Sequence, residues 1–233
     1  MIKLNAMKKS FGIIILLFAF TTVQSQVLIT LLLGDKLNAP GLEFGLETGV
    51  SWAGISNMES NNRLTAFNLG FYFDIKMKGQ LYLYTGVMVK SKMGVDKLTT
   101  GDLEFLGTEQ FEEEGEYRQS INYFLVPALA KYKFKNHFYL EAGPQFGLAH
   151  KSWVEFNVDN DQQTARIREF NIDNLRRFDV GVSGGLGYRL MKGTGVTIGV
   201  KYYYGFLDVY KEKGGTNNHS LLAKVNIPIG ASE

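Results

Sequence analysis

The feature of this sequence that most constrains its fold is a strict alternation of apolar with polar or small residues along eight separate segments. In the segment 67–76 every odd position holds a large apolar residue, whereas the even positions hold Asn, Gly, Tyr, Asp and Lys. Successive side chains of a β-strand point to opposite faces, so each segment predicts a strand with one apolar and one polar face. The segments are Leu42–Trp52, Thr65–Lys76, Leu81–Val95, Ser120–Phe134, Phe138–His150, Arg177–Leu190, Val196–Val209 and His219–Ile229.

The lengths of these segments and of their links favour a barrel that crosses a membrane. A tilted transmembrane strand needs about 9–11 residues, which most of the segments reach. Short links at 77–79, 135–137 and 192–194 alternate with long links at 56–64, 96–119, 151–176 and 210–218. We therefore predict an all-β, eight-stranded antiparallel up-and-down barrel, integral to the outer membrane, with short periplasmic turns and longer outer loops.

The hairpins can be checked against the face assignment, because residues paired across antiparallel strands point to the same side. Pairing Phe134 with Phe138 and Leu190 with Val196 keeps each pair on the apolar face and predicts turns with an odd number of residues. Asn136 is then the candidate for the left-handed position of its turn. Pro127 and Pro144 lie inside two adjacent strands and each removes a backbone donor, which predicts bulges or other irregularity there.

The polar faces carry charges of both signs, together with many glycines. An eight-stranded barrel has an interior just wide enough for side chains, so we interpret these charges as an internal paired network and not as a conduction path. A soluble binding barrel or a β-sandwich would instead turn the apolar faces, which are rich in Phe and Tyr, inward. The charged residues are Glu43, Glu47, Asp74, Lys76, Lys90, Lys92, Lys131, Glu141, Asp179, Arg189, Lys201 and Lys224.

The first 26 residues have the layout of a signal peptide. Lys8 and Lys9 precede an apolar run at 11–20, which is too short to span a bilayer, and cleavage is expected beside Ser25 or Gln26. Met7 is an alternative start to Met1. Removing residues 1–26 takes three lysines from 25 basic residues and leaves the 23 acids, so the formal charge changes from +2 to −1. A nucleic-acid partner is therefore not expected.

The expected organisation is a signal peptide at 1–26, a periplasmic N-terminal segment at 27–41 and the barrel at 42–230. The chain contains no cysteine, which excludes disulfides, thiolate metal sites, a Cys nucleophile and an N-terminal lipoprotein anchor. No cofactor, metal or catalytic residue is assigned. The segment Val27–Leu33 has six apolar residues in seven without alternation, and it could pack on the barrel rim or dock on a partner.

Several stretches of the mature chain resemble the PorT-type outer-membrane barrel family of Bacteroidota. The resemblance implies the same barrel fold and, since the founding member is associated with the type IX secretion system, a structural, assembly or secretion-accessory role. Fold alone does not fix function. The stretches are 26–38 (QVLITLLLGDKLN), 42–49 (LEFGLETG), 126–132 (VPALAKY), 139–145 (YLEAGPQ) and 179–188 (DVGVSGGLGY).

One rival function is hydrolysis of lipid in the outer leaflet. His150 and Ser152 lie two residues apart at the outer end of a predicted strand, and on one face they could act as base and nucleophile, with Glu155 as the carboxylate. A polar rim leading into a loop explains the same residues. An enzyme is therefore not expected.

The outer loops offer a second rival function, surface recognition. One loop is acidic and the next is basic, so the two loops could pair, or the arginines could bind lipopolysaccharide phosphates. The expected partners are outer-membrane lipid and lipopolysaccharide, with secretion or assembly proteins docking through Val27–Leu33. The acidic residues of the second outer loop are Asp102, Glu104, Glu109, Glu112, Glu113, Glu114 and Glu116, and the arginines of the third are Arg166, Arg168, Arg176 and Arg177.

Overall fold

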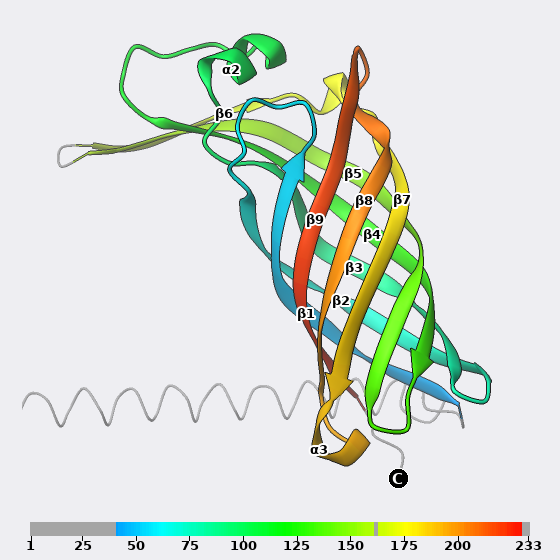
Figure 1. The fold of residues 1–233 in the computed structure, drawn as a ribbon. Helices are drawn as coiled ribbons and strands as arrows, with labels where there is room; N and C mark the ends of the chain where they lie inside the picture. Colours follow the sequence, from blue (N-terminus) through cyan, green and yellow to red (C-terminus); the bar gives the residue numbers. More distant parts are fainter. Residues whose placement is uncertain (1–40, 161–162, 230–233) are drawn as a thin grey trace, which may run out of the picture.

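The computed structural model describes residues 41–160 and 163–229, which form a closed antiparallel barrel (Figure 1). Neighbouring strands pair around a ring of eight in the order β1, β2, β3, β4, β5, β7, β8, β9, and β9 pairs with β1 to close it. The strands are β1 (Leu42–Ile55), β2 (Leu64–Lys78), β3 (Leu81–Val95), β4 (Glu116–Lys133), β5 (Phe138–Asn160), β6 (Gln163–Phe170), β7 (Phe178–Arg189), β8 (Thr197–Tyr210) and β9 (Lys213–Pro228). The predicted signal peptide and the segment Val27–Leu33 lie outside the described residues.

The apolar face of each strand points outward and the polar face points into the barrel. Phe67, Phe138 and Leu186 are each about half exposed on the outside, whereas Glu47, Asp74 and Lys224 are at most 2% exposed on the inside. A soluble barrel would show the opposite arrangement, since burial of apolar surface drives its folding. The strands thus confirm the predicted transmembrane barrel. Among the residues that the structure describes, no helix is long and apolar enough to cross a membrane.

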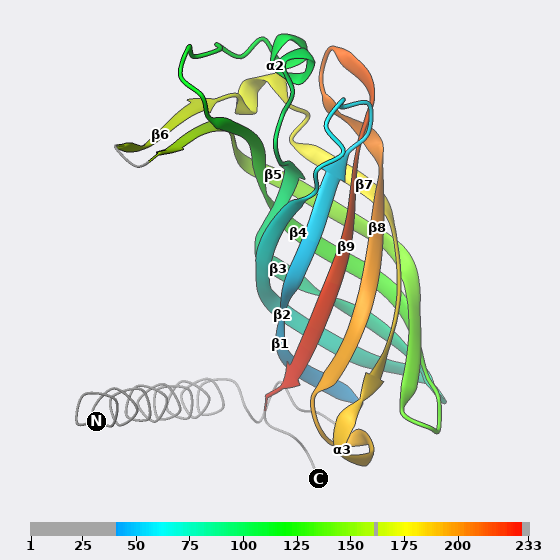
Figure 2. The same cartoon turned by 60° about the vertical axis from the view of Figure 1, so that its left-hand side comes forward.

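Two of the long links contain regular structure that the alternation did not predict. The link 151–176 contains the upper part of β5, the strand β6 and a 3₁₀-helix, η1 (Ile172–Asn174), while the link 96–119 contains the helix α2 (Thr100–Leu106). β6 pairs with β5 alone, and Figure 2 shows the resulting hairpin extending away from the barrel wall. On the β5 side of this hairpin Val154, Phe156 and Val158 are buried, whereas residues 166–170 of β6 are exposed, so β6 lacks the buried face that the barrel strands have.

The turns confirm the predicted register but correct one detail. The backbone N–H of Phe134 donates to the carbonyl of Phe138 at 2.8 Å, and that of Leu190 donates to Val196 at 2.9 Å. The left-handed residue of the first turn is His137, with φ of 69°, so the prediction for Asn136 was wrong.

The two prolines interrupt the pairing of β4 with β5 but introduce no bulge between them. Pro127 lies opposite Gln145, the pairing resumes at Ala130 and Ala142, and the register is the same on both sides. A missing N–H therefore costs local ladder bonds here without adding a residue to either strand. The predicted irregularity is present and the predicted bulge is not.

Bulges occur instead in the outer halves of β3 and β5. In β3 the register shifts by one residue between Met88 and Ser91, so the adjacent residues Val89 and Lys90 both point outward. In β5 the pairing with β4 skips His150. An extra residue reverses the faces beyond it. Lys90 and Lys92 were therefore wrongly placed in the lumen, and Lys76 lies exposed at the rim.

Candidate functional site

The inner half of the lumen, next to the short turns, is filled by an ion-pair network centred on Lys224. The Lys224 ammonium donates to Glu141 at 2.5 Å and lies 3.7 Å from Glu47. Glu47 also binds Lys201 at 3.1 Å. These four side chains come from β9, β5, β1 and β8, and all are buried. Such charges are stable away from water only when each has a partner, which this arrangement provides.

A second group of charges lies beside the first and is joined to it through two tyrosines. Asp74 binds Lys131 at 2.9 Å and Lys133 at 2.7 Å. The ammonium groups of Lys131 and Lys224 both lie over the ring of Tyr84, at 4.8 Å and 4.3 Å from its centre, and both also lie over the ring of Tyr139. Cation–π attraction in a site without bulk water adds to the ion pairs. The predicted internal network is thus present, built from six of the twelve charges together with Lys133 and the tyrosines.

Glycines on the polar faces leave space for the tyrosine rings of the interior. A Cβ atom added to Gly45 would lie 2.5 Å from the ring of Tyr72, and one added to Gly187 would lie 2.5 Å from the hydroxyl of Tyr139. Contacts this short do not occur between unbonded carbon and heavy atoms at ordinary packing density. The glycines therefore allow a filled interior, as their position on the inner face predicted.

The outer half of the lumen combines a buried apolar cluster with a few hydrogen-bonded polar residues, such as Asp179 with Asn218, and is covered by the long loops. The buried apolar cluster there combines strand residues such as Met93, Ile121 and Val209 with Leu98 and Leu103 from the loop that carries α2. Asp102 of α2 holds this loop against the β1–β2 loop, because its carboxylate accepts backbone N–H bonds from Glu59 at 2.7 Å and from Ser60 and Thr99 at 3.0 Å. The outer mouth is therefore closed by a packed lid.

The charged and apolar halves together leave little open space between them. The cavity in the middle of the lumen, lined by residues that include Asn68, Met88 and Lys201, has a volume of about 20 Å³. A cavity of this size holds roughly one water molecule, far fewer than a column of water along the barrel needs. The described part of the barrel therefore contains no continuous water path along its axis at this level.

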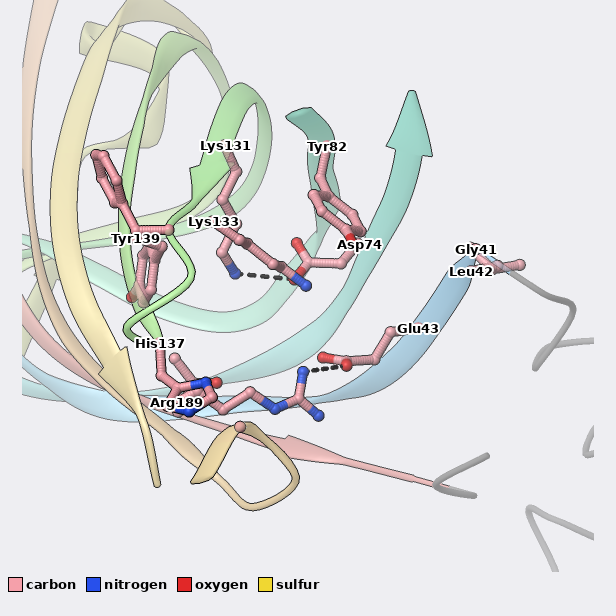
Figure 3. A pocket seen from close by; sticks show the side chains of 13 residues that line it. Gly41, Leu42, Glu43, Asp74, Tyr82, Lys131, Lys133, His137, Tyr139 and Arg189 are labelled. Atoms are coloured by element: carbon pink, nitrogen blue, oxygen red, sulfur yellow. Dashed lines mark hydrogen bonds and ion pairs between the residues drawn. The ribbon is translucent and has the colours of Figure 1, made fainter. Parts of the chain in front are cut away.

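The periplasmic mouth is a polar pocket of about 300 Å³, shown in Figure 3. Arg189 donates to Glu43, and Lys131 and Lys133 both bind Asp74, so the three lysine and arginine cations on its wall are already paired. Gly41, the first described residue, also lines the pocket. The segment that precedes residue 41 is therefore covalently joined to this mouth.

The predicted His150 and Ser152 pair is not formed. The bulge in β5 leaves His150 exposed on the outer surface, where its ring stacks on Phe124 with centres 4.5 Å apart. Ser152 is fully buried on the inner side, and its hydroxyl donates to Asn171 at 2.6 Å and accepts from Gln119 at 2.8 Å. The extra residue turns the two side chains to opposite faces, so they cannot act together as a base and nucleophile.

Glu155, the proposed third catalytic residue, belongs instead to the β5–β6 hairpin above the barrel. Its carboxylate accepts from Arg168 at 2.6 Å and lies 3.7 Å from Arg166. Burial acts to raise the pKa of Glu155, but the hydrogen bond and charge of Arg168, with that of Arg166, hold the pKa below its usual value. These two arginines therefore pair within their own hairpin and not with the acidic loop.

The acidic loop shows no arrangement suited to a cation. Asp102 is used to cap α2 and to bind the neighbouring loop, and Glu116 pairs with Lys97 at 2.8 Å. Within residues 41–160 and 163–229, no three His, Cys, Asp or Glu side chains gather closely enough to hold a metal ion.

Sequence reasoning also missed a group of lysines around Trp153, because the bulges that assemble it have no clear signal in the sequence.

A closed ring of eight antiparallel strands, with an apolar exterior and charged interior, defines the class of integral outer-membrane β-barrels. The sequence agrees with this class. Residues 34–211 match the family described as outer membrane protein beta-barrel domain, so the chain belongs to that family. No curated protein sequence matches the chain.

Three of the solved structures that align with most of this chain are the following. Ail, the attachment invasion locus protein of Yersinia pestis, in complex with the heparin analogue sucrose octasulfate, aligns with a TM-score of 0.45 at 11% identity, over 81% of this chain and 99% of that one. Neisserial surface protein A aligns with a TM-score of 0.40 at 10% identity, over 82% and 98%. OprG from Pseudomonas aeruginosa aligns with a TM-score of 0.30 at 12% identity, over 80% and 91%.

Proposed function

We propose that this protein is a non-conducting barrel that works by binding partners at its two ends, in a structural, assembly or surface-recognition role. The observation that carries the proposal is the filled lumen, with a charged network at the inner half, an apolar core at the outer half and a central cavity of about 20 Å³. A transport function would need an open path, which eight strands with this interior do not provide. The hydrolase alternative has no support from the placement of His150 and Ser152.

Conductance measurements test the closed state directly. We expect the purified protein, inserted into planar lipid bilayers at neutral pH, to give no stepwise conductance, because bulky side chains occupy the lumen along its length. A sixteen-stranded porin inserted by the same procedure serves as the positive control. Reproducible single-channel steps from the wild-type protein would overturn the proposal.

A secretion-accessory role is the finer version of this proposal, and it rests on the resemblance to the PorT-type family. The position of Gly41 supports a periplasmic site of action for the preceding residues, because it joins them to the inner mouth. In this version the apolar segment Val27–Leu33 binds a secretion or assembly protein of the envelope.

A pull-down from outer membranes in mild detergent tests the docking segment. We expect a stoichiometric partner to copurify with the wild-type protein and to be lost when Leu31 and Leu33 are both replaced by Asp, since charges on an apolar contact surface oppose burial. The exposed pair Lys76→Asp and Lys78→Asp, on the same side of the membrane, is the matched control. A partner that stays with the Leu31→Asp, Leu33→Asp variant rules out this segment as the docking element.

A further inference from the structure

Cationic and aromatic side chains gather on the outer surface of β3, β4 and β5, just above the apolar belt. Lys92, Asn122 and Lys151 are direct neighbours across these strands, so the two lysines flank one asparagine in a single row. The β3 bulge turns Lys90 to the same surface, and the β5 bulge does the same for His150. Two irregularities in neighbouring parts of the sheet thus build one positively charged surface.

Trp153 forms the centre of this surface. Trp153 is 5% exposed, and cations surround its ring: the Lys92 and Lys151 ammonium groups lie 5.4 Å and 5.6 Å from the ring centre, and the Arg168 guanidinium lies 5.0 Å away. Lys90 lies 5.3 Å from the ring of Phe67. Cation–π contacts hold the ammonium groups close together despite their mutual repulsion.

The lysines of this surface have no ion-pair partner among the described residues. Lys90, Lys92 and Lys151 form none, while Glu155, a carboxylate whose charge reaches Lys92, is engaged by Arg168 at 2.6 Å. The side chains of Lys90, Lys92, His150 and Phe67 line a groove of about 390 Å³. Concentrated positive charge without a counterion is an anion-binding arrangement, and phosphate accepts several such donors at once.

The position of the groove identifies the kind of anion. Directly below it the strands present exposed apolar residues toward the acyl chains, among them Phe124, Val126 and Leu148. His150 stacks on Phe124 at the boundary between the two zones. A molecule that matches both zones has a phosphorylated headgroup and hydrocarbon chains, and such lipids form the outer leaflet.

We propose that the Lys90, Lys92 and Lys151 surface binds the phosphorylated headgroup of an outer-leaflet lipid whose chains lie on the apolar belt beneath it. The proposal goes beyond the closed-barrel function and does not depend on it. A lipid held there would place the β5–β6 hairpin against the headgroup layer.

Trp153 supplies a reporter for the test, because the chain has two tryptophans and Trp52→Phe leaves Trp153 alone. The protein in detergent micelles is titrated with diphosphoryl lipid A, with the dephosphorylated lipid and with inorganic phosphate, and Trp153 fluorescence is recorded. We expect a saturable change with diphosphoryl lipid A alone. An equal response to the dephosphorylated lipid, or the same response to inorganic phosphate at equal concentration, would overturn the proposal.

Lysine variants locate the site. Because each lysine near a phosphorylated surface contributes roughly fivefold in affinity, Lys92→Gln should weaken binding about fivefold and the triple change of Lys90, Lys92 and Lys151 to Gln about a hundredfold. The same triple change at Lys76, Lys78 and Lys192, all exposed at the periplasmic end, removes equal charge and should leave affinity unchanged. The shift in gel mobility on heating shows whether a variant is folded. If the folded variant with Lys90, Lys92 and Lys151 changed to Gln binds like the wild type, the proposed site is contradicted.

Discussion

Replacing Lys224 by Met is expected to lower the free energy of unfolding by about 3–5 kcal/mol, because breaking a buried ion pair by removing one partner leaves an uncompensated charge. Lys224 is the shared partner of Glu141 and Glu47, and its ammonium lies 4.3 Å from the centre of the Tyr84 ring. Glu47 retains Lys201, whereas Glu141 loses the partner to which it is bound in the wild type. Urea unfolding in lipid vesicles, followed by tryptophan fluorescence, measures the loss.

Two further variants separate the buried charge from a general effect of the substitution. The double change Lys224→Met, Glu141→Gln removes both charges and should recover at least half of the lost stability, since an isolated neutral amide costs less than an isolated carboxylate. Lys192→Met, at an exposed residue of the β7–β8 turn, should change stability by less than about 0.5 kcal/mol. A loss below about 1 kcal/mol for Lys224→Met would show that the network contributes little.

Replacing Asp102 by Ala is expected to loosen the outer lid without unfolding the barrel. The substitution leaves the backbone N–H groups of Glu59, Ser60 and Thr99 without their carboxylate acceptor. The Ser60 donor is buried and costs about 1–3 kcal/mol when left unsatisfied, so local opening should become at least about fivefold more frequent. Amide hydrogen exchange of residues 98–107, measured by mass spectrometry, reports this opening.

Glu104→Ala is the matched control, because Glu104 lies on the same helix and its side chain is exposed. We expect wild-type exchange in that variant. We also expect the Asp102→Ala protein to remain non-conducting, since the charged inner half of the lumen still fills the barrel when the lid opens. Unchanged exchange at 98–107 in Asp102→Ala would mean that apolar packing, for example of Leu103, holds the lid by itself.

Much of the barrel was predictable from the sequence because the two faces of a transmembrane strand lie in different environments. Lipid on one side and a packed polar interior on the other impose the period of two, which located all eight strands of the ring and gave the bounds of β3 without error. The hairpin pairings at Phe134 and Leu190 followed from the same face assignment. The charges at Glu47, Asp74, Lys131, Glu141, Lys201 and Lys224 were correctly placed inside for that reason.

The parts that could not be predicted are those where the alternation stops or shifts. A bulge adds one residue to a strand and reverses the faces beyond it, but no glycine or proline stands at or next to Val89 and Lys90 to mark it. The hydrolase hypothesis for His150 and Ser152 failed for the same reason. The strand β6 and the helix α2 lie outside the membrane ring, where no lipid imposes a pattern.

The central ion pairs join residues that are far apart along the chain, and this separation has a consequence for assembly. Glu47 of the first strand meets Lys201 and Asn226 of the last two strands, 154 and 179 residues later. These Glu47 contacts form only when β1 comes together with β8 and β9, whereas the Asp74 pairs with Lys131 and Lys133 join strands that are close in sequence. Closing so large a loop costs conformational entropy, and the stabilising free energy of these contacts offsets that cost only after the loop has closed. While the seam between β1 and β9 is open, Glu47 therefore lacks the partners that it has in the folded barrel, and closure of the ring supplies them.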